Sequence, residues 1–396
     1  MGSRLRMVLA ALGSIALVGC GGAAAPPIVS SAASSGASAS AVSTSAAATP
    51  AGSTQDSIPV KPMADLTAFA SGQVGDIIAG GPGFLVVGYI ARPDNGVDGA
   101  VWTSADGLAW IKGPGQKSFA DRLLTDVVAI PGGFAAGGQE CASTGGGECG
   151  RLNVWNSPDG TAWTPATFEV ARDVDCCNLE GLAARGPGMV GVGSDLSDVS
   201  SGPKDAISLT SADGRSWAVH RGDPTLVDAE TTSVVSGGPG LIAVGGRASG
   251  AFAAWSSADG TTWTSAAPLA GVTTGAARDV IVGGPGFVAV GKDGADAAVW
   301  TSADGAKWAR LPASEGLKGG LMNRVILVGG TIVAVGKAGL GAALWTSPDG
   351  VTWTRLPDQD SFSGTEMTSV AAAGKTVVIF GKRPSGTLPA WTASLP

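Results

Sequence analysis

A nine-residue pattern, W-x-S-x-D-G-x-x-W, recurs along this chain and constrains its fold more than any other feature. Complete copies occupy residues 102–110, 155–163, 255–263, 300–308 and 345–353, a copy at 209–217 begins with Leu209, and Trp391 begins a truncated seventh copy. The aspartates of the pattern are Asp106, Asp159, Asp213, Asp259, Asp304 and Asp349, spaced 45 to 54 residues apart. A period in this range is typical of propellers and related repeat arrays.

Each copy follows a second marker, which consists of two apolar runs joined by a turn. Residues 76–88 and 279–291 show the marker with a Gly-Gly-Pro-Gly turn, and the last two units lose the proline. Proline fixes φ and glycine accepts positive φ, so this turn is tight. Each unit therefore contains four antiparallel strands, and the chain is predicted to be all-β, a seven-bladed β-propeller with four-stranded antiparallel blades.

The S-x-D-G segment has the composition of a type I turn closed by a left-handed glycine. Its aspartate can accept backbone N–H groups across the turn. The two flanking tryptophans are expected to pack between neighbouring blades, and the alternative is an aromatic platform for a sugar. Because the same turn recurs around the ring, we interpret the six aspartates as structural.

The seventh unit ends after its third strand, so another segment must supply its outer strand. Alignment of the units places Ser57–Met63 at that position, although its two prolines weaken it as a hydrogen-bonding strand. The predicted propeller domain is residues 57–396.

The repeat resembles the Asp-box, or BNR, repeat of the sialidase superfamily, with one departure: glycine follows the aspartate directly here. The resemblance implies the propeller fold and a structural role for the six aspartates. Sialidases are associated with a tyrosine nucleophile and three arginines that clamp the sugar carboxylate. This chain has a single tyrosine, Tyr89, and the arginines Arg92, Arg122, Arg278 and Arg324 cannot be placed in such a triad from sequence.

The N-terminal region predicts export. Residues 1–19 have two arginines, then an apolar run too short to span a bilayer, and end Leu-Val-Gly before Cys20. This resembles a bacterial lipobox, with Cys20 lipidated. Residues 20–56 are rich in Ala, Ser and Pro and predict a disordered tether. We therefore expect an extracytoplasmic cell-envelope protein attached to the membrane by a lipid anchor.

One face of the propeller is expected to carry the variable loops, here named the loop face, and the other to carry the repeated turns, the turn face. The longest loops are Ile90–Gly99, Gln139–Leu152 and Ser194–Ala206, in blades one to three. A ligand site is expected on the loop face there, because function tends to lie on variable loops; tolerated surface insertions are the alternative. Disulfide candidates in the same region are Cys141, Cys149, Cys176 and Cys177, with cross-pairing between the two segments favoured over Cys141–Cys149 plus a vicinal bond.

Acidic residues suggest two further sites. Three pairs of loop aspartates suggest calcium sites, but none has the residue spacing of a calcium-binding loop. The pairs are Asp94 with Asp98, Asp195 with Asp198, and Asp293 with Asp296. Asp76, Asp126 and Asp279 share one register on the innermost strands with Arg324, which predicts a ring in the central channel or ordinary turn capping. We expect no metal site at the four cysteines, because the only histidine, His220, lies in a different blade from them. We also expect no cofactor.

The net charge of -7 and the lack of a Lys/Arg cluster argue against nucleic acid as a partner. A monomer is expected. The loop face is poor in aromatic residues, so the main hypothesis is a non-catalytic lipoprotein whose propeller binds or scaffolds an unknown protein, glycan or other envelope polymer, with no catalytic residues. The alternative is an exported carbohydrate-active, sialidase-like hydrolase, which predicts an acid-lined pocket with paired carboxylates.

Overall fold

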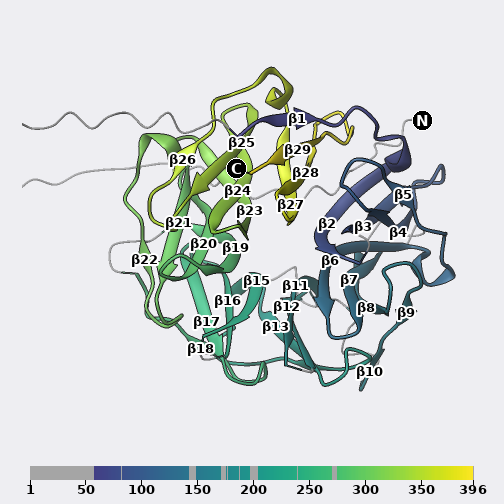
Figure 1. Ribbon diagram of the computed structural model, residues 1–396. Helices are drawn as coiled ribbons and strands as arrows, with labels where there is room; N and C mark the ends of the chain where they lie inside the picture. Colours follow the sequence, from purple (N-terminus) through teal and green to yellow (C-terminus); the bar gives the residue numbers. More distant parts are fainter. Residues whose placement is uncertain are drawn as a thin grey trace, which may run out of the picture. The chain divides into compact units, whose positions relative to one another are not determined.

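The computed structural model describes residues 58–81, 83–141, 149–170, 175, 177–186, 188–196, 204–238, 240–269 and 274–395. The described residues from 58 onward belong to one compact unit. Seven antiparallel sheets surround a central axis in this unit (Figure 1). The predicted seven-bladed propeller is confirmed.

The strands follow one another from the axis outward in each of the first six blades. Blade one has β2 (Gly72–Gly80), β3 (Gly83–Ala91), β4 (Val97–Ser104) and β5 (Ile111–Lys112); blade two has β6 (Arg122–Ile130), β7 (Gly133–Cys141), β8 (Cys149–Ser157) and β9 (Thr164–Pro165). Blade three has β11 (Cys177–Arg185), β12 (Gly188–Asp195), β13 (Ala206–Ser211) and β14 (Ser216–His220). Blade four has β15 (Ala229–Gly237), β16 (Gly240–Arg247), β17 (Phe252–Ser257) and β18 (Thr264–Ser265).

The remaining blades repeat this order. Blade five has β19 (Ala276–Gly283), β20 (Gly286–Asp293), β21 (Asp296–Ser302) and β22 (Ala309–Arg310); blade six has β23 (Gly320–Val328), β24 (Thr331–Ala338), β25 (Gly341–Ser347) and β26 (Thr354–Arg355). Blade seven has β27 (Glu366–Ala373), β28 (Thr376–Lys382), β29 (Ala390–Ser394) and, outermost, β1 (Val60–Pro62). In the part of the chain that the structure describes, short 3-10 helices lead into four blades: η1 (Thr67–Phe69), η2 (Lys117–Phe119), η4 (Glu315–Leu317) and η5 (Asp360–Phe362).

Blade seven is closed by the N-terminal segment. β1 runs antiparallel to β29, with Val60 opposite Ala393 and Pro62 opposite Trp391. The innermost strand β27 also contacts β2 of blade one, which completes the circle of innermost strands. The predicted closure is therefore confirmed, and the pairing begins three residues after the first residue of the predicted segment.

Blade three departs from the predicted four strands. A fifth strand, β10 (Thr167–Phe168), pairs in parallel with β14 on its outer side. Thr167 donates its backbone N–H to Arg215, and Glu169 donates its N–H to Trp217. Repeat counting could not show this strand because it lies in the connection between blades, where the pattern carries no signal.

The repeated turn has the predicted geometry. In blade six, Asp349 Oδ1 accepts the N–H groups of Val351 and Thr352 at 2.8 and 2.7 Å, and Ser347 Oγ accepts the N–H of Gly350 at 2.8 Å. Gly350 has a φ of 78°, in the left-handed region that favours glycine. The same bonds recur around Asp106, Asp159, Asp213, Asp259 and Asp304. These carboxylates cap the turns, as predicted.

The tryptophans on the third strands form the core between blades. Each of them is at most 1% exposed: Trp102, Trp155, Trp255, Trp300, Trp345 and Trp391. Trp102 stacks on Phe69 of η1, with ring centroids 4.9 Å apart, and its Nε1 donates to Ala68 O at 2.7 Å. Their complete burial confirms the packing role and leaves no platform for a sugar at these six side chains.

Every innermost strand contains a β-bulge at the same position. The bulged residues are Gly75, Thr125, Glu180, Thr232, Arg278, Asn323 and Thr368. A bulge inserts one extra residue and re-aims the side chains that follow it. Because the innermost strands line the axis, these bulges determine which side chains reach the central channel.

Candidate functional site

The bulges bring polar side chains from different blades to one cavity on the axis. The cavity has a volume of about 190 Å³ and is lined by all seven innermost strands. Its charged side chains are Asp76, Asp126, Glu180, Asp279 and Arg324, here named the axial cluster. The predicted common register of Asp76, Asp126, Asp279 and Arg324 is confirmed, since each follows the bulged residue of its strand. Glu180 is the member that the sequence did not single out.

The three aspartates of the axial cluster connect neighbouring blades. Asp126 Oδ2 accepts the backbone N–H of Leu182 in the next blade at 2.7 Å. Asp279 Oδ2 accepts the N–H of Val325 in the same way at 2.9 Å, and its Oδ1 accepts the hydroxyl of Ser233 at 2.8 Å. Asp76 accepts the N–H of Val127 at 3.4 Å. The predicted ring in the channel is confirmed, whereas ordinary turn capping is not what these aspartates do, because the groups that they bind belong to the strands of neighbouring blades.

Several bulged residues also connect blades. Thr232 Oγ1 donates to Ala277 O of the next blade at 3.1 Å, and Asn323 Nδ2 donates to Met367 O at 2.8 Å. Thr125 Oγ1 makes a longer contact of this kind. A small hydrogen-bonding side chain at the bulge thus has a structural role that repeats around the ring.

Glu180 and Arg278 occupy bulge positions but do not fit this structural pattern. Both are charged where the repeat uses threonine or asparagine, and no described backbone carbonyl of the next blade accepts a bond from either. Between blades three and four the hydrogen bond runs in the opposite direction, because Thr231 Oγ1 of blade four donates to Gly193 O of blade three at 3.1 Å. The side chain of Glu180 is therefore not required for this contact between blades.

Asp76 and Asp126 are neighbouring carboxyl groups in the axial cavity, and each affects the pKa of the other. Burial raises the pKa of Asp76 well above its ordinary value, and the neighbouring charge of Asp126 raises it further. Burial also raises the pKa of Asp126, but the positive charge of Arg324 opposes the rise. Two adjacent buried carboxyls cannot both ionise easily, and the rise in pKa is larger at Asp76 than at Asp126.

Glu180 carries a proton donor suited to neutral pH. Burial in the channel, reinforced by the charge of Glu230, raises the pKa of Glu180 to about 7, although Arg324, Lys204 and Arg278 oppose the rise. Asn178 Nδ2 donates to Glu180 Oε1, and Asn178 Oδ1 accepts the N–H of Ser194 at 3.0 Å. A carboxyl group with a pKa near the working pH is the usual requirement for general acid catalysis.

Arg324 supplies a positive charge to the same cavity. Burial alone would lower the pKa of Arg324, but the surrounding carboxylates, Asp279 first, outweigh it and the pKa is raised. Within the described part of the chain, Arg324 and Arg278 make no hydrogen bond or ion pair with another side chain. Their N–H donors are available to a ligand.

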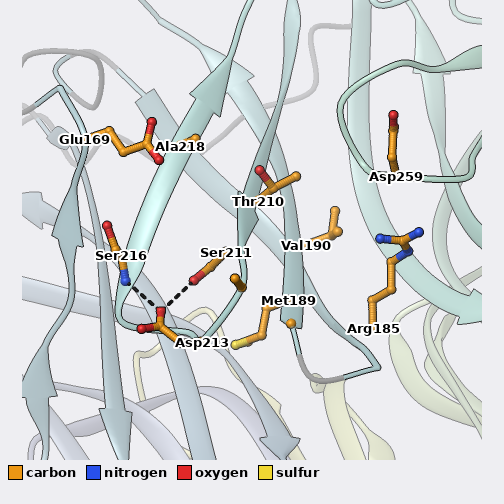
Figure 2. Close-up of a pocket in the computed structure, with 12 residues that line it drawn as sticks. Glu169, Arg185, Met189, Val190, Thr210, Ser211, Asp213, Ser216, Ala218 and Asp259 are labelled. Carbon is orange, nitrogen blue, oxygen red and sulfur yellow. Dashed lines mark hydrogen bonds between the residues drawn. The ribbon is translucent and has the colours of Figure 1, made fainter.

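A second hollow lies on the turn face beside blade three, and its volume is about 560 Å³ (Figure 2). Asp213 and Asp259 line it, and each is fully engaged in its own turn. The backbone N–H groups that donate to Asp213 and Asp259 lower the pKa of both carboxyls. Arg185 donates to Ala258 O across the hollow. This hollow is larger than the axial cavity, but the two aspartates that line it are used by the repeated turns.

Most of the loop aspartates considered for calcium bind other groups. Arg92 forms ion pairs with Asp94 at 3.1 Å and Asp98 at 2.5 Å, and Arg310 pairs with Asp293 at 2.7 Å. Asp296 accepts the N–H of Gly319. Asp195 pairs with Arg221, and Asp198 lies outside the described residues. In the described part of the chain, no three His, Cys, Asp or Glu side chains are arranged to hold a metal ion.

The cysteine predictions are tested only in part. Cys141 and Cys149 face each other in the register of β7 and β8, which favours a bond between these two over cross-pairing. Cys177 is buried at the start of β11, and its Sγ accepts a hydrogen bond from Arg221. The Cys149 side chain and all of Cys176 lie outside the described residues, so the disulfide pairing stays a prediction. Cys20 and the tether also lie outside them.

No protein-family model and no curated protein matches the chain. Among solved structures, it is similar to an α-L-arabinanase of Penicillium chrysogenum in complex with arabinobiose, at 13% identity over 85% of this chain and 96% of that one, with a TM-score of 0.49. An α-L-arabinofuranosidase of Fusarium graminearum with arabinobiose matches at 13% identity over 84% and 96%, with a TM-score of 0.48. A Trypanosoma rangeli sialidase with the inhibitor DANA matches at 14% identity over 70% and 56%, with a TM-score of 0.44.

The fold resemblance to sialidases drawn from the Asp-box repeat is confirmed, and at such identities the likeness is one of fold. The hypothesis of a non-catalytic binding or scaffold module is corrected in favour of its alternative. The channel holds the acid-lined pocket with paired carboxyls that the alternative, a hydrolase, predicts. The hypothesis was wrong because it depended on the scarcity of aromatic residues on the loop face, whereas the acid-lined pocket lies among the innermost strands.

Proposed function

We propose that this chain is an exported carbohydrate-active hydrolase that cleaves a glycosidic bond in the axial cavity. The observation that carries the proposal is Glu180, a carboxyl with a pKa of about 7 that shares this cavity with the Asp76–Asp126 pair. Glycosidases combine one protonated carboxyl with one ionised carboxylate. The axial cluster supplies both on neighbouring blades.

In the proposed reaction, Glu180 donates its proton to the oxygen of the glycosidic bond as the bond to the anomeric carbon breaks. The leaving group departs as an alcohol. A water molecule adds to the anomeric carbon and loses a proton to Asp126, which acts in this proposal as the carboxylate of the pair. Asp126 then releases this proton to solvent, Glu180 takes one up from solvent, and the net change is hydrolysis.

Arg324 and Arg278 are proposed to orient the substrate. Guanidinium groups donate in a fixed fork to oxygen atoms; Arg324 lines the cavity, and Arg278 is close enough to act on Glu180 through its charge. A cavity of about 190 Å³ holds roughly six water molecules, which limits the reacting group to about one monosaccharide. Arg324 also favours the ionised form of Asp126 through its charge.

A panel of aryl glycosides, arabinobiose and a sialoside would test the proposal. Glu180→Gln should slow arabinobiose cleavage by about a hundredfold or more. The same variant should affect a dinitrophenyl glycoside much less, because that leaving group needs no proton. Asp126→Asn should slow both. Failure of the wild-type protein to cleave any glycan in the panel, or equal rates for wild type and Glu180→Gln, would rule the proposal out.

Export and lipid anchoring are part of the proposal. They are supported by the n-region, apolar run and Leu-Val-Gly-Cys20 sequence of residues 1–20. In the part of the chain that the structure describes, no helix is long and apolar enough to cross a bilayer. Metabolic labelling with a fatty acid tests the anchor: wild type should be labelled and Cys20→Ser should not. Equal labelling of the two would contradict lipidation at Cys20.

A further inference from the structure

Blades six and seven hold a carboxylate between them, near the start of their innermost strands. Glu366 Oε1 accepts a hydrogen bond from Asn323 Nδ2 of blade six at 2.9 Å, and its Oε2 pairs with Lys337 Nζ of the same blade at 3.2 Å. Lys382 Nζ lies 3.6 Å from Oε1. Burial would raise the pKa of Glu366, but Asn323 and the two lysines outweigh it and the pKa is lowered. The arrangement therefore stabilises an ionised carboxylate.

Blade five has two cations at the positions that hold this carboxylate. Arg278 is the bulge residue of β19, as Asn323 is the bulge residue of β23. Lys292 occupies in β20 the register that Lys337 occupies in β24. β19 and β20 contact β23 of blade six, just as β23 and β24 contact β27 of blade seven. The repeat therefore directs Arg278 and Lys292, here named the cation pair, toward blade six.

Blade six lacks the acid that would complete the arrangement. Leu321, which is 8% exposed, occupies in blade six the position that Glu366 occupies in blade seven. Among the described residues, neither Arg278 nor Lys292 makes a hydrogen bond or an ion pair. An apolar side chain thus stands where the repeat would place the carboxylate partner of two cations.

The acidic side chains of blade five are engaged elsewhere. Asp293 pairs with Arg310 at 2.7 Å, and Asp296 accepts the backbone N–H of Gly319 at 2.8 Å. Asp279 accepts two hydrogen bonds from other blades. These contacts leave the positive charge of the cation pair without an acidic partner among the described residues of its own blade.

The turns beside the cation pair leave it accessible. Lys292 is exposed, and Arg278 is half-buried. The turns that follow β20 and β24 are short. A Cβ added to Gly294 in the first of them, or to Gly339 in the second, would meet nothing within 4 Å. A ligand can therefore approach the cation pair from solvent.

The cation pair lies beside the axial cavity and not in it. Arg278 acts on the pKa of Glu180 through its charge, so these two side chains are near each other. Neither member of the pair lines the cavity, which holds about one monosaccharide. The sugar that adjoins the reacting one therefore lies outside the cavity, as the cation pair does.

We infer that the cation pair binds a carboxylate of the substrate, and that the substrate is an acidic glycan whose carboxylate-bearing sugar adjoins the cleaved bond. The ligand carboxylate takes between blades five and six the place that Glu366 takes between blades six and seven. Guanidinium and ammonium groups form charge-assisted hydrogen bonds with carboxylates, which are stronger than bonds between neutral groups. The inference rests on the proposed hydrolase function and deepens it by naming the substrate class.

Binding to Glu180→Gln tests the inference without turnover. The probes are trigalacturonate and a mannuronate trisaccharide, each compared by calorimetry with its neutral, carboxyl-reduced form. At least one acid should bind about tenfold or more tightly than its neutral form. In the same background, Arg278→Thr and Lys292→Met should remove most of this preference; threonine suits the bulge, where Thr232 stands in blade four. Lys307→Met, in the repeated turn of the same blade, is the matched control and should keep the preference.

A second variant supplies the missing carboxylate from the chain itself. Leu321→Glu should remove the preference for the acid, because its carboxylate occupies the cation pair. Leu321→Gln has the same size without the charge and should keep the preference. Gln73 and Glu230 occupy the equivalent position in blades one and four, so the repeat accommodates both side chains. Thermal midpoints near that of wild type establish that the two variants are folded.

The outcomes separate this inference from the proposed function. If no acid binds more tightly than its neutral form, or if the preference survives in Arg278→Thr, Lys292→Met and Leu321→Glu, the inference is wrong even when the protein cleaves a neutral glycan such as arabinobiose. If the preference is present but no glycan is cleaved, the cation pair is a carboxylate site and the hydrolase proposal fails. Tighter binding of a sulfated trisaccharide than of either acid would overturn the assignment to carboxylate.

Discussion

Gly291 lies so close to the backbone of the neighbouring strand that a Cβ added to it would stand 2.1 Å from the carbonyl oxygen of Ala276. The same relationship exists in every blade, because the bulge of the innermost strand pushes one carbonyl toward the second strand. The glycines are Gly88, Gly138, Gly193, Gly245, Gly291, Gly336 and Gly381, with contacts of 1.9 to 2.4 Å. The repeated glycine is thus a direct consequence of the bulge that forms the channel.

Gly291→Ala is expected to destabilise the propeller by about 3 kcal/mol, since the strands must separate to admit the methyl group. Urea denaturation followed by tryptophan fluorescence measures the change. Gly115→Ala is the matched control, because nothing lies within 4 Å of its added Cβ. An equal midpoint for the two variants would show that the bulge does not impose this contact.

Asp279→Ala should also destabilise the fold, by about 2 kcal/mol. It leaves the Val325 N–H and the Ser233 hydroxyl without their acceptor inside the channel. Asp279→Asn should recover part of the loss, because its amide oxygen can accept one of the two bonds. Asp358→Ala is the control: Asp358 is 72% exposed and pairs only with Arg355 on the surface, so the change should stay within about 0.5 kcal/mol. A larger loss of stability in Asp358→Ala than in Asp279→Ala would contradict the role of Asp279 as the acceptor of these two hydrogen bonds.

The parts of the fold that repeat could be predicted from the sequence. The Ser-x-Asp-Gly turn is a local structure, so its hydrogen bonds follow from four residues, as around Asp349. Closure by Val60–Pro62 followed from counting strands, since the seventh unit was one strand short. The shared register of Asp76, Asp126 and Asp279 followed from aligning the units on their glycines.

The key site residue could not be recognised in the same way. Glu180 sits at a bulge, where one extra residue breaks the alternation that assigns side chains to faces of a strand. Its raised pKa depends on burial in the central channel, which the sequence does not show. One signal was present: at the position where Thr125 and Thr232 stand in their blades, blade three has a glutamate.

Glu180→Gln should stabilise the protein at neutral and alkaline pH. The pKa of Glu180 is about 7 in the folded protein, above its ordinary value of 4.5, so the folded state binds more protons than the unfolded state between these values. Stability due to this group is fully present below about pH 4.5 and falls as pH rises toward 7. Glutamine does not titrate, so Glu180→Gln removes this pH dependence and raises the free energy of unfolding by an amount on the order of 2 kcal/mol above pH 7.

Unfolding midpoints of wild type and Glu180→Gln, measured from pH 5 to 8, check this prediction. Parallel profiles for wild type and Glu180→Gln would mean that Glu180 titrates normally.

The strand that closes the ring gives the last prediction. Val60 is 7% exposed and packs in the core of blade seven with Trp391 and Ala393, whereas the neighbouring Lys61 side chain points to solvent. Val60→Asp should destabilise the propeller by about 3 kcal/mol, because a charge would replace an apolar group in that core. Lys61→Asp places the same side chain one residue further on, where the strand alternation turns it outward, and should cost less than about 1 kcal/mol.

Limited proteolysis adds a local readout: in Val60→Asp, cleavage before Met63 should become fast while the other blades stay resistant. If the two variants unfold at the same midpoint and resist protease equally, β1 contributes nothing to closure and blade seven is stable with three strands.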